Sequence, residues 1–83
     1  MTKEQVRNQL NSFICTEILQ KPSYSLADNV PLISGGVISS FSFVEILVFI
    51  EEKFNVYIPD REWATDSLDT MSQIVDRIMR ELP

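Results

Sequence analysis

The sequence predicts an all-α domain, and three observations support this prediction. Apolar residues recur at helical spacing in three stretches, whereas no stretch alternates polar and apolar residues well enough to indicate a sheet. Two stretches, "TKEQ" at residues 2–5 and "TMSQ" at residues 70–73, have the form of a capping box, which marks the start of a helix. The chain has 83 residues, the size of one small domain. We therefore expect a single domain, residues 1–83, folded as a small four-helix bundle with three longer helices and one short helix.

The first helix should begin at the capping box of residues 2–5 and end near Leu19, because Pro22 cannot continue it. Its buried face should consist of Val6, Leu10, Phe13, Ile14 and Ile18. Residues 20–36 contain two prolines, two glycines and several small polar residues, which predict a long loop between the first and second helices. The apolar side chains expected to anchor this loop are Tyr24, Leu26, Val30 and Leu32.

The second helix should start at Ser39 or Ser40 and run to about Phe54. One stripe of its side chains is predicted to be core, namely Phe43, Leu47, Ile50 and Phe54, with Ile46 beside it. A second stripe, roughly 100–180° away around the helix, consists of Phe41, Glu45, Val48 and Glu52. So thin a bundle cannot bury both stripes, and we expect the second to be exposed together with its two apolar members.

The last part of the chain should contain the short helix and a third long one. Asn55 and Pro59 end the second helix, and Asp60 is expected to cap one short helical turn around Trp63. The capping box at residues 70–73 then opens the last helix. Its inward side chains should be Met71, Ile74, Val75, Ile78 and Leu82.

The composition excludes several classes of function. Seven basic residues against twelve acidic ones give a net charge of −5, which disfavours nucleic acid as a partner. Histidine is absent, so Ser-His-Asp and Cys-His catalysis are excluded, and we expect neither a catalytic residue nor a metal site. Glu51 and Glu52 point about 100° apart on a helix and favour a solvated face over a catalytic carboxylate pair.

The chain also lacks the features of a secreted or membrane protein. The segment "MTKEQVRNQL" has no apolar region of a signal peptide, and the longest apolar run is far shorter than the about 20 residues that a membrane span needs. Cys15 is the single cysteine and is expected to be a small buried group in the first helix. These features predict a cytoplasmic protein without a membrane partner.

Three serines compete for a chemical role, namely Ser39, Ser40 and Ser67. The stretch "PLISGGVISSFSFVEILVFIEEKFNVYIPD" resembles the acyl carrier protein family, which includes peptidyl carrier domains, and the resemblance covers nearly the whole chain. Three anchors fix its register: the Gly35–Gly36 pair, the run "VEILVFIEEKF" and the "IPD" that follows. The letters "DSL" at residues 66–68 also match the family's motif, but the segment after them resembles the entry to the family's last helix, and no long apolar helix with paired glutamates follows. Ser67 is therefore interpreted as part of a loop before a cap.

The resemblance places Ser40 on the serine that the family esterifies with 4′-phosphopantetheine. It also places Phe41 on the leucine of the family's motif and Ser39 on its aspartate, so this chain departs from the family at Ser39. A serine at a helix N-terminus lies among unpaired amides at the positive end of the helix dipole, a setting that tolerates the charge of a phosphodiester. The hydroxyl needs no histidine, because a transferase can supply the base and the metal. The alternative for Ser40 is a plain N-cap that is never modified.

The resemblance implies a carrier and not an enzyme: the arm on Ser40 holds an acyl or aminoacyl group as a thioester and passes it between enzymes. Expected partners are a phosphopantetheinyl transferase, a loading enzyme and a downstream synthase or transferase, which would contact a monomer through Phe41, Glu45, Val48 and Glu52. Ser42 and Lys53 stand where primary-metabolism carriers commonly have acids. This favours a polyketide or nonribosomal peptide pathway over general fatty acid synthesis. The alternative function is an unmodified helical interaction module that keeps the carrier fold.

Overall fold

The structure is a computed structural model that describes residues 2–21, 23–59, 62 and 68–82. The chain forms α1 (Lys3–Phe13), the short π-helix η1 (Ile14–Ile18), α2 (Ser40–Phe54) and α4 (Met71–Glu81). No strand is present among the described residues, which confirms the prediction of an all-helical domain. The short helix expected around Trp63 falls mostly on residues outside this part of the chain, so a fourth helix stays a prediction.

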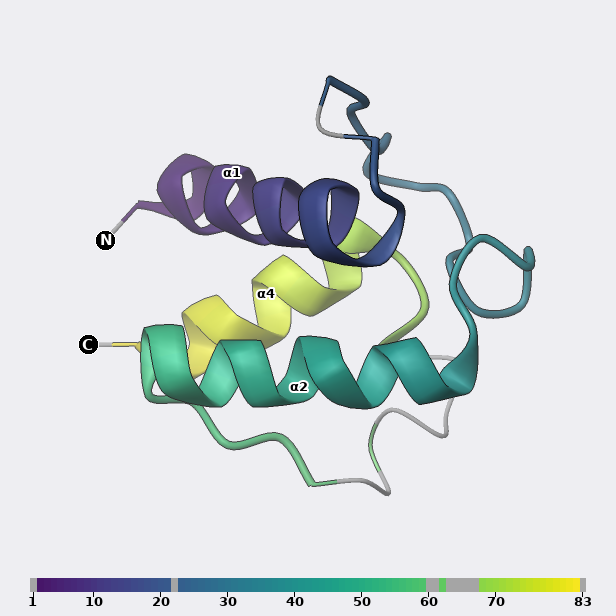
Figure 1. Cartoon of the computed structure of the whole chain (residues 1–83). Coiled ribbons are helices and arrows are strands. Elements are labelled where there is room, and N and C mark those ends of the chain that lie inside the picture. Colours follow the sequence, from purple (N-terminus) through teal and green to yellow (C-terminus); the bar gives the residue numbers. More distant parts are fainter. Residues whose placement is uncertain (1, 22, 60–61, 63–67, 83) are drawn as a thin grey trace.

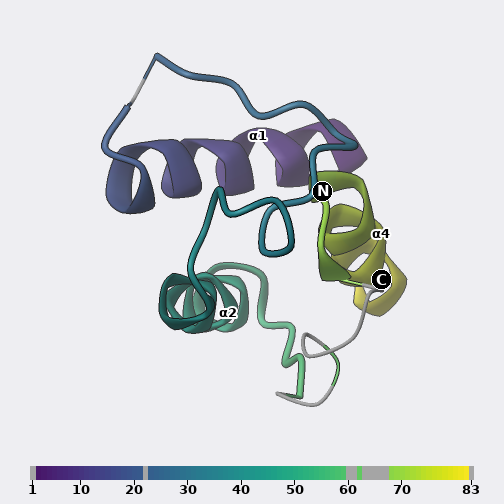
Figure 2. The same cartoon turned by 90° about the vertical axis from the view of Figure 1, so that its right-hand side faces the viewer.

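The three long helices surround one core. In Figure 1, α1 and α2 run in opposite directions, and α4 runs in the same general direction as α2. Figure 2 shows α2 end-on, with α1 across the top and α4 at the right. The loop between η1 and α2 passes over α1 and then descends to the start of α2.

The predicted helix boundaries are confirmed where capping chemistry sets them. Both capping boxes form, with Thr2 and Gln5 closing the start of α1 and Thr70 and Gln73 closing the start of α4. Asn55 ends α2 in the left-handed conformation, with φ 58°, which asparagine tolerates better than most residues. None of the helices that the structure describes is long and apolar enough to cross a membrane.

The end of the first helix differs from a simple α-helix. The chain stays helical to Ile18, as expected, but its last turn is a π-helix in which the Leu19 amide donates to the Ile14 carbonyl at 2.9 Å. The adjacent residues Ile14 and Cys15 are both fully buried in this turn. The prediction that Cys15 is a buried group in the helix is confirmed, and burial raises the pKa of its thiol.

The core follows the predicted helix faces. The expected inward stripe of α2 is fully buried or nearly so, as are Val6, Leu10 and Ile14 from the first helix and Met71, Ile74, Val75 and Ile78 from α4. Phe13 and Ile18 of the first helix, and Leu82 after α4, are partly buried. Phe13 stacks on Phe49 with ring centroids 4.1 Å apart, which joins α1 to α2 at a contact that the stripes did not predict.

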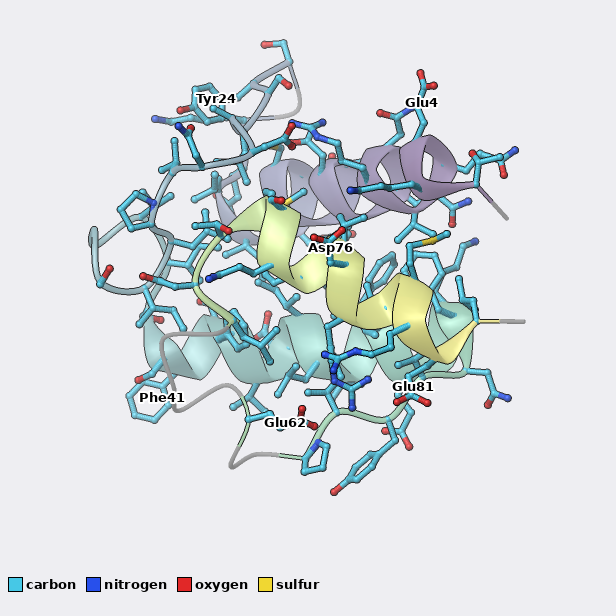
Figure 3. All side chains as sticks on the ribbon, turned by 180° about the vertical axis from the view of Figure 1, so that it is seen from behind. Glu4, Tyr24, Phe41, Glu62, Asp76 and Glu81 are labelled. Atoms are coloured by element: carbon cyan, nitrogen blue, oxygen red, sulfur yellow. The ribbon has the colours of Figure 1, made fainter. Side chains whose placement is uncertain are left out.

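The long loop is held differently from the prediction. Leu26 and Leu32 are buried anchors and Val30 is partly buried, but Tyr24 is 49% exposed, so its predicted role as an anchor is wrong. The Tyr24 amide donates to the Lys21 carbonyl in a turn, and the side chain projects from the loop (Figure 3). Polar contacts from α1 replace it: Asn11 accepts from the Leu26 amide at 2.9 Å, and Arg7 donates to the Leu26 carbonyl.

Candidate functional site

The candidate site begins at the N-terminus of α2, where Ser39 is the N-cap. Ser39 has extended backbone angles, and its Oγ accepts from the Ser42 amide at 3.2 Å. It also donates to the Ser42 hydroxyl at 3.2 Å. Ser40 is therefore not the N-cap, because Ser39 takes that position and Ser40 is the first residue of the helix. Its modification stays a prediction.

The Ser40 side chain is left without a structural role. Ser40 is exposed, and its hydroxyl has no hydrogen-bond partner in the part of the chain that the structure describes. The amides of Ser40 and Phe41 likewise have no acceptor there, whereas the next two amides donate to Ser39. The first turn of α2 contains no acidic residue. This end of the helix therefore offers unpaired donors and an uncompensated positive dipole next to an accessible hydroxyl, which suits the oxygens of a phosphodiester.

The second stripe of α2 is exposed as predicted. Phe41 is 87% exposed and Val48 is 48% exposed, and Glu45 and Glu52 are exposed as well. Figure 3 shows Phe41 projecting away from the helices. Val44, 46% exposed, extends the apolar part of this face and was missed, although its spacing of three residues from Phe41 and four from Val48 indicates the same face. The role of this face in partner binding stays a prediction.

A compact turn, residues 32–38, leads into the site. The Leu32 carbonyl accepts from the amides of Val37 and Ile38, both at 2.9 Å, and the Ile33 carbonyl accepts from the Gly36 amide at 3.1 Å. Leu32 and Ile38 are buried, so the turn is fixed to the core at both ends. Figure 1 shows it as the small coil just before α2. Only Ser39 separates this turn from Ser40.

Both glycines of the pair inside the turn are required by its geometry. A Cβ at Gly35 would lie 2.3 Å from the Pro31 carbonyl oxygen, which is too close for any side chain. Gly36 has φ +76°, in the left-handed region that other residues adopt at a cost. The pair used as a sequence anchor thus has a structural function, since it closes the chain on itself immediately before the site.

Asp69, the residue before the N-cap of α4, binds this turn. Its carbonyl accepts from the Leu32 amide at 2.6 Å, and its Oδ1 accepts from the amides of Ile33 at 2.7 Å and Ser34 at 3.2 Å. The Ser34 hydroxyl donates to Oδ2. These bonds, the Ser34 hydroxyl first, hold the pKa of Asp69 below its ordinary value, because they favour the carboxylate form. Sequence reasoning missed this contact because its partners lie 35 and 36 residues apart.

The other residues weighed from the sequence lie away from this site. Glu51 and Glu52 are exposed, in agreement with a solvated face. Ser67 and Trp63 lie outside the described residues, so their interpretations stay predictions. A further missed feature is Arg77, which is 8% exposed on α4 and donates to both carboxylate oxygens of Glu62 at 3.0 Å and to Glu81 at 2.8 Å. Figure 3 shows Glu81 at the end of α4 and Glu62 on the segment that lies below it in this view.

Comparison with known proteins gives three related sequences of the same kind. No family model matches the chain. The D-alanyl carrier protein of Bacillus velezensis is 28% identical over 65 residues, which cover 78% of this chain and 83% of that protein. The D-alanyl carrier protein of Bacillus licheniformis is 27% identical over 71 residues, covering 86% and 91%. That of Leuconostoc mesenteroides is 29% identical over 76 residues, covering 92% and 90%.

The chain is similar along most of its length to three proteins named as carriers. This similarity supports the resemblance to carrier proteins that was predicted from the sequence. A protein that carries a group has to present it to other proteins from its surface. The open N-terminus of α2 and the exposed face beside it are the two features described above that suit such a task.

Proposed function

We propose that the chain is a carrier protein whose Ser40 is esterified with 4′-phosphopantetheine and holds an acyl or aminoacyl group as a thioester. The observation that supports this most directly is the exposed Ser40 hydroxyl, which has no described partner and lies beside two unpaired amides at the start of α2. The bound arm supplies a terminal thiol, to which the transported group is attached. The chain itself catalyses nothing and provides the attachment point and the surface that enzymes recognise.

The residues at the start of α2 fit the attachment. In the transfer reaction the Ser40 Oγ forms a phosphodiester bond with the pantetheine-bearing phosphorus of coenzyme A. The pyrophosphate bond breaks, adenosine 3′,5′-bisphosphate leaves, and the hydroxyl proton goes to a base of the transferase. The free amides of Ser40 and Phe41 stabilise the negative charge that remains at the helix N-terminus. Ser39, which stands where the resemblance places the family's aspartate, caps the helix by accepting from the Ser42 amide.

The exposed face of α2 is the proposed binding surface for the partner enzymes. It consists of Phe41, Val44 and Val48, with Glu45 and Glu52 beside them. The partners that fit it are a phosphopantetheinyl transferase, a loading enzyme and a downstream transferase or synthase. Because the chain has a net charge of −5, a complementary partner has an apolar patch with basic residues around it.

The names of the relatives favour an aminoacyl cargo. All three are named for a D-alanyl group, which is one of the aminoacyl groups that the proposed arm can hold. The polyketide, nonribosomal peptide and fatty acid pathways considered from the sequence stay as alternatives for the cargo. Among these possibilities we propose D-alanine, activated by a separate adenylating ligase, as the first to test.

The attachment site is tested by intact mass. With coenzyme A, magnesium and a broad-specificity transferase, the chain should gain the mass of one phosphopantetheine group. Ser40→Ala should abolish this gain, and the stability of that variant should change by less than about 0.5 kcal/mol, because the hydroxyl has no described partner. Ser39→Ala and Ser67→Ala are the matched controls and should both be modified. Modification of Ser40→Ala, or a wild-type chain that no transferase modifies, would contradict the proposal and favour the unmodified interaction module.

The cargo is tested on the modified chain. Incubated with ATP, D-alanine and a ligase that loads the D-alanyl carrier protein of Bacillus licheniformis, it should gain one alanyl group. The unmodified chain is the control and should gain none. If the ligase loads the Bacillus protein and not this one, D-alanine is the wrong cargo and the other acyl groups are to be tried in its place.

The binding surface is tested with Val48→Asp. This substitution puts a charge in the centre of the apolar face, so transfer from the loading enzyme should fall at least about tenfold, a loss of about 1.4 kcal/mol. The fold should be kept, since Val48 lies on the exposed side of α2. Asn8→Asp adds the same charge at an exposed position of α1 and should have little effect. Equal transfer by the two variants would show that the partners bind elsewhere.

A further inference from the structure

The turn before Ser40 is held by a residue that no sequence motif marks, Asp69. We propose that Asp69 is a positioning residue for the modification of Ser40: by binding residues 32–34 it fixes the turn that presents Ser40 at the start of α2. This inference rests on the proposed function, because it concerns how the transferase meets its serine. It assigns Asp69 no contact with the arm or with coenzyme A.

The first step of the inference is the number of contacts that one residue makes to one short segment. Three consecutive residues, Leu32, Ile33 and Ser34, donate their amides to Asp69, one to its carbonyl and two to its Oδ1. The Ser34 hydroxyl donates to the second carboxylate oxygen. Hydrogen bonds to a carboxylate are stronger than those between neutral groups. Four donors of residues 32–34 therefore bond to Asp69, and together they fix the orientation of this segment relative to α4.

The second step is that Asp69 is itself held in place. Gln73, in the first turn of α4, accepts from the Asp69 amide at 2.8 Å and from the Thr70 amide at 3.1 Å. The Ser72 amide donates to the carbonyl of Asp28, at 3.1 Å, so the start of α4 also binds an earlier part of the same loop. Asp69 thus belongs to the rigid end of a helix, and the turn must adopt the orientation that this end imposes.

The third step connects the turn to Ser40. The Leu32 amide donates to Asp69, and the Leu32 carbonyl accepts from the amides of Val37 and Ile38, the last two residues of the turn. Ile38 is buried, and Ser39 follows as the N-cap of α2. A series of hydrogen bonds followed by two peptide links therefore joins the start of α4 to Ser40. If the Asp69 contacts are lost, the segment that a transferase must accommodate next to Ser40 becomes free to move.

The test compares four variants as substrates of the transferase, at a temperature where circular dichroism shows each to be folded. Asp69→Ala removes the carboxylate, and we expect kcat/KM for the modification to fall about tenfold, since misplacement of a reacting group by about 1 Å can cost more than this. Asp69→Asn keeps an oxygen for the amides of Ile33 and Ser34 and can donate to the Ser34 hydroxyl, so it should stay within about twofold of the wild type. Ser34→Ala loses only the hydroxyl contact and should lie between them.

The fourth variant separates positioning from stability. Val6→Ala makes a cavity in the core on α1 and destabilises the fold without removing any atom that bonds to Asp69. Its kcat/KM should stay near that of the wild type while the protein is folded. A second measurement, amide hydrogen exchange, should show faster exchange at Val37 and Ile38 in Asp69→Ala, and unchanged exchange in α1.

The outcomes distinguish this inference from the proposed function. A wild-type chain that is never modified contradicts the proposed function. A wild-type chain that is modified, together with Asp69→Ala modified at the same rate, overturns the role of Asp69 alone. The role is also overturned if Val6→Ala slows the modification as much as Asp69→Ala does. Should Asp69→Ala fail to fold, Ser34→Ala decides: an unchanged rate in that variant overturns the inference.

Discussion

The helices α2 and α4 both start with a hydroxyl residue as N-cap, but they differ in how many of their first amides are hydrogen-bonded. At α4, Thr70 accepts from Gln73, while the Gln73 side chain accepts from the amides of Asp69 and Thr70, and the Asp28 carbonyl takes the Ser72 amide. At α2, the Ser39 hydroxyl accepts from Ser42 alone, and the amides of Ser40 and Phe41 have no acceptor among the described residues. Within the first turn, only the Met71 amide of α4 lacks an acceptor among the described residues, whereas two amides of α2 lack one, so the end of α4 is the more closed of the two.

The Asp28 carbonyl pairs the second amide of α4, and the third residue of each helix explains the difference at the cap residue itself. A capping box needs glutamine or glutamate there, since only a long side chain reaches back to the amide of the cap residue. Gln73 fills this position in α4, whereas Ser42 fills it in α2 and bonds only to the cap hydroxyl. The closed end of α4 is thereby suited to hold other parts of the fold. The open end of α2 is suited to hold a charged group that is not part of the chain.

The largest effect should come from breaking the link between the two ends. Gly35→Ala puts a methyl group 2.3 Å from the Pro31 carbonyl oxygen, so the turn that joins Asp69 to α2 has to move. We expect the free energy of unfolding to fall by about 2–3 kcal/mol, the range for overpacked sites, in urea titrations. Gly36→Ala is the comparison and should cost about 1–2 kcal/mol through its positive φ alone. A loss below about 0.5 kcal/mol for Gly35→Ala would show that the turn gives way easily and does not fix the start of α2.

The next effect should come from removing each cap in turn. Thr70→Ala disrupts a complete capping box at the end that holds the loop, and it should cost about 1–2 kcal/mol of unfolding free energy. Ser39→Ala removes a single cap bond of 3.2 Å at the open end, and about 0.5–1 kcal/mol should be lost. Thermal or urea unfolding of both variants measures the difference. If Ser39→Ala is the more costly of the two, the contrast between a closed and an open end is wrong.

A smaller effect should come from adding charge to the open end. Ser39→Asp puts a carboxylate at the N-terminus of α2, which should stabilise the fold by about 0.3–1 kcal/mol through the helix dipole. It also restores the residue type of the family's motif, and we expect faster modification of Ser40 at limiting transferase. Ser39→Asn is the uncharged control with a similar cap. Slower modification of Ser39→Asp would indicate a transferase adapted to serine at this position.

The smallest effect should come from acid, at the closed end. The pKa of Asp69 is lowered in the folded chain from an ordinary value of 3.8, so its carboxylate stabilises the fold fully above that value. This contribution is lost as the pH falls through the lower pKa of the folded state, and partial exposure of Asp69 keeps it small through solvent screening. The free energies of unfolding of the wild type and Asp69→Asn, measured by urea titration, should therefore become equal below pH 3.8 and differ above it. A constant difference at all pH values would show that the charge of Asp69 does not matter.

The features that the sequence predicted well depend on short-range patterns. The starts of α1 and α4 follow from their capping boxes, the end of α2 from Asn55, and the inward face of α2 from its helical spacing. The exposed face with Phe41 and Val48 follows from the same spacing. These features need only the geometry of one helix and the volume of a thin bundle, both of which a single sequence contains.

The features that were missed depend on contacts across the chain. Tyr24 was expected in the core because it is apolar, but polar groups of α1 hold the loop and leave its ring outside. Asp69 looks from the sequence like an ordinary residue before a cap, and its bonds to Ile33 and Ser34 appear only once α4 lies beside the turn. The π-helix at Ile14–Ile18 likewise has no local pattern that distinguishes it from an α-helix.

The burial of Cys15 allows the thiol of an attached arm to be labelled selectively. Its side chain is fully covered, and burial raises the pKa of the thiol, so little reactive thiolate is present at neutral pH. A maleimide or a fluorescent iodoacetamide added to the folded protein should therefore label the end of an attached arm and leave the polypeptide unlabelled. The chain then acts as its own reporter: dye incorporated under native conditions counts arms with a free thiol, and dye incorporated in denaturant adds one cysteine for every chain present.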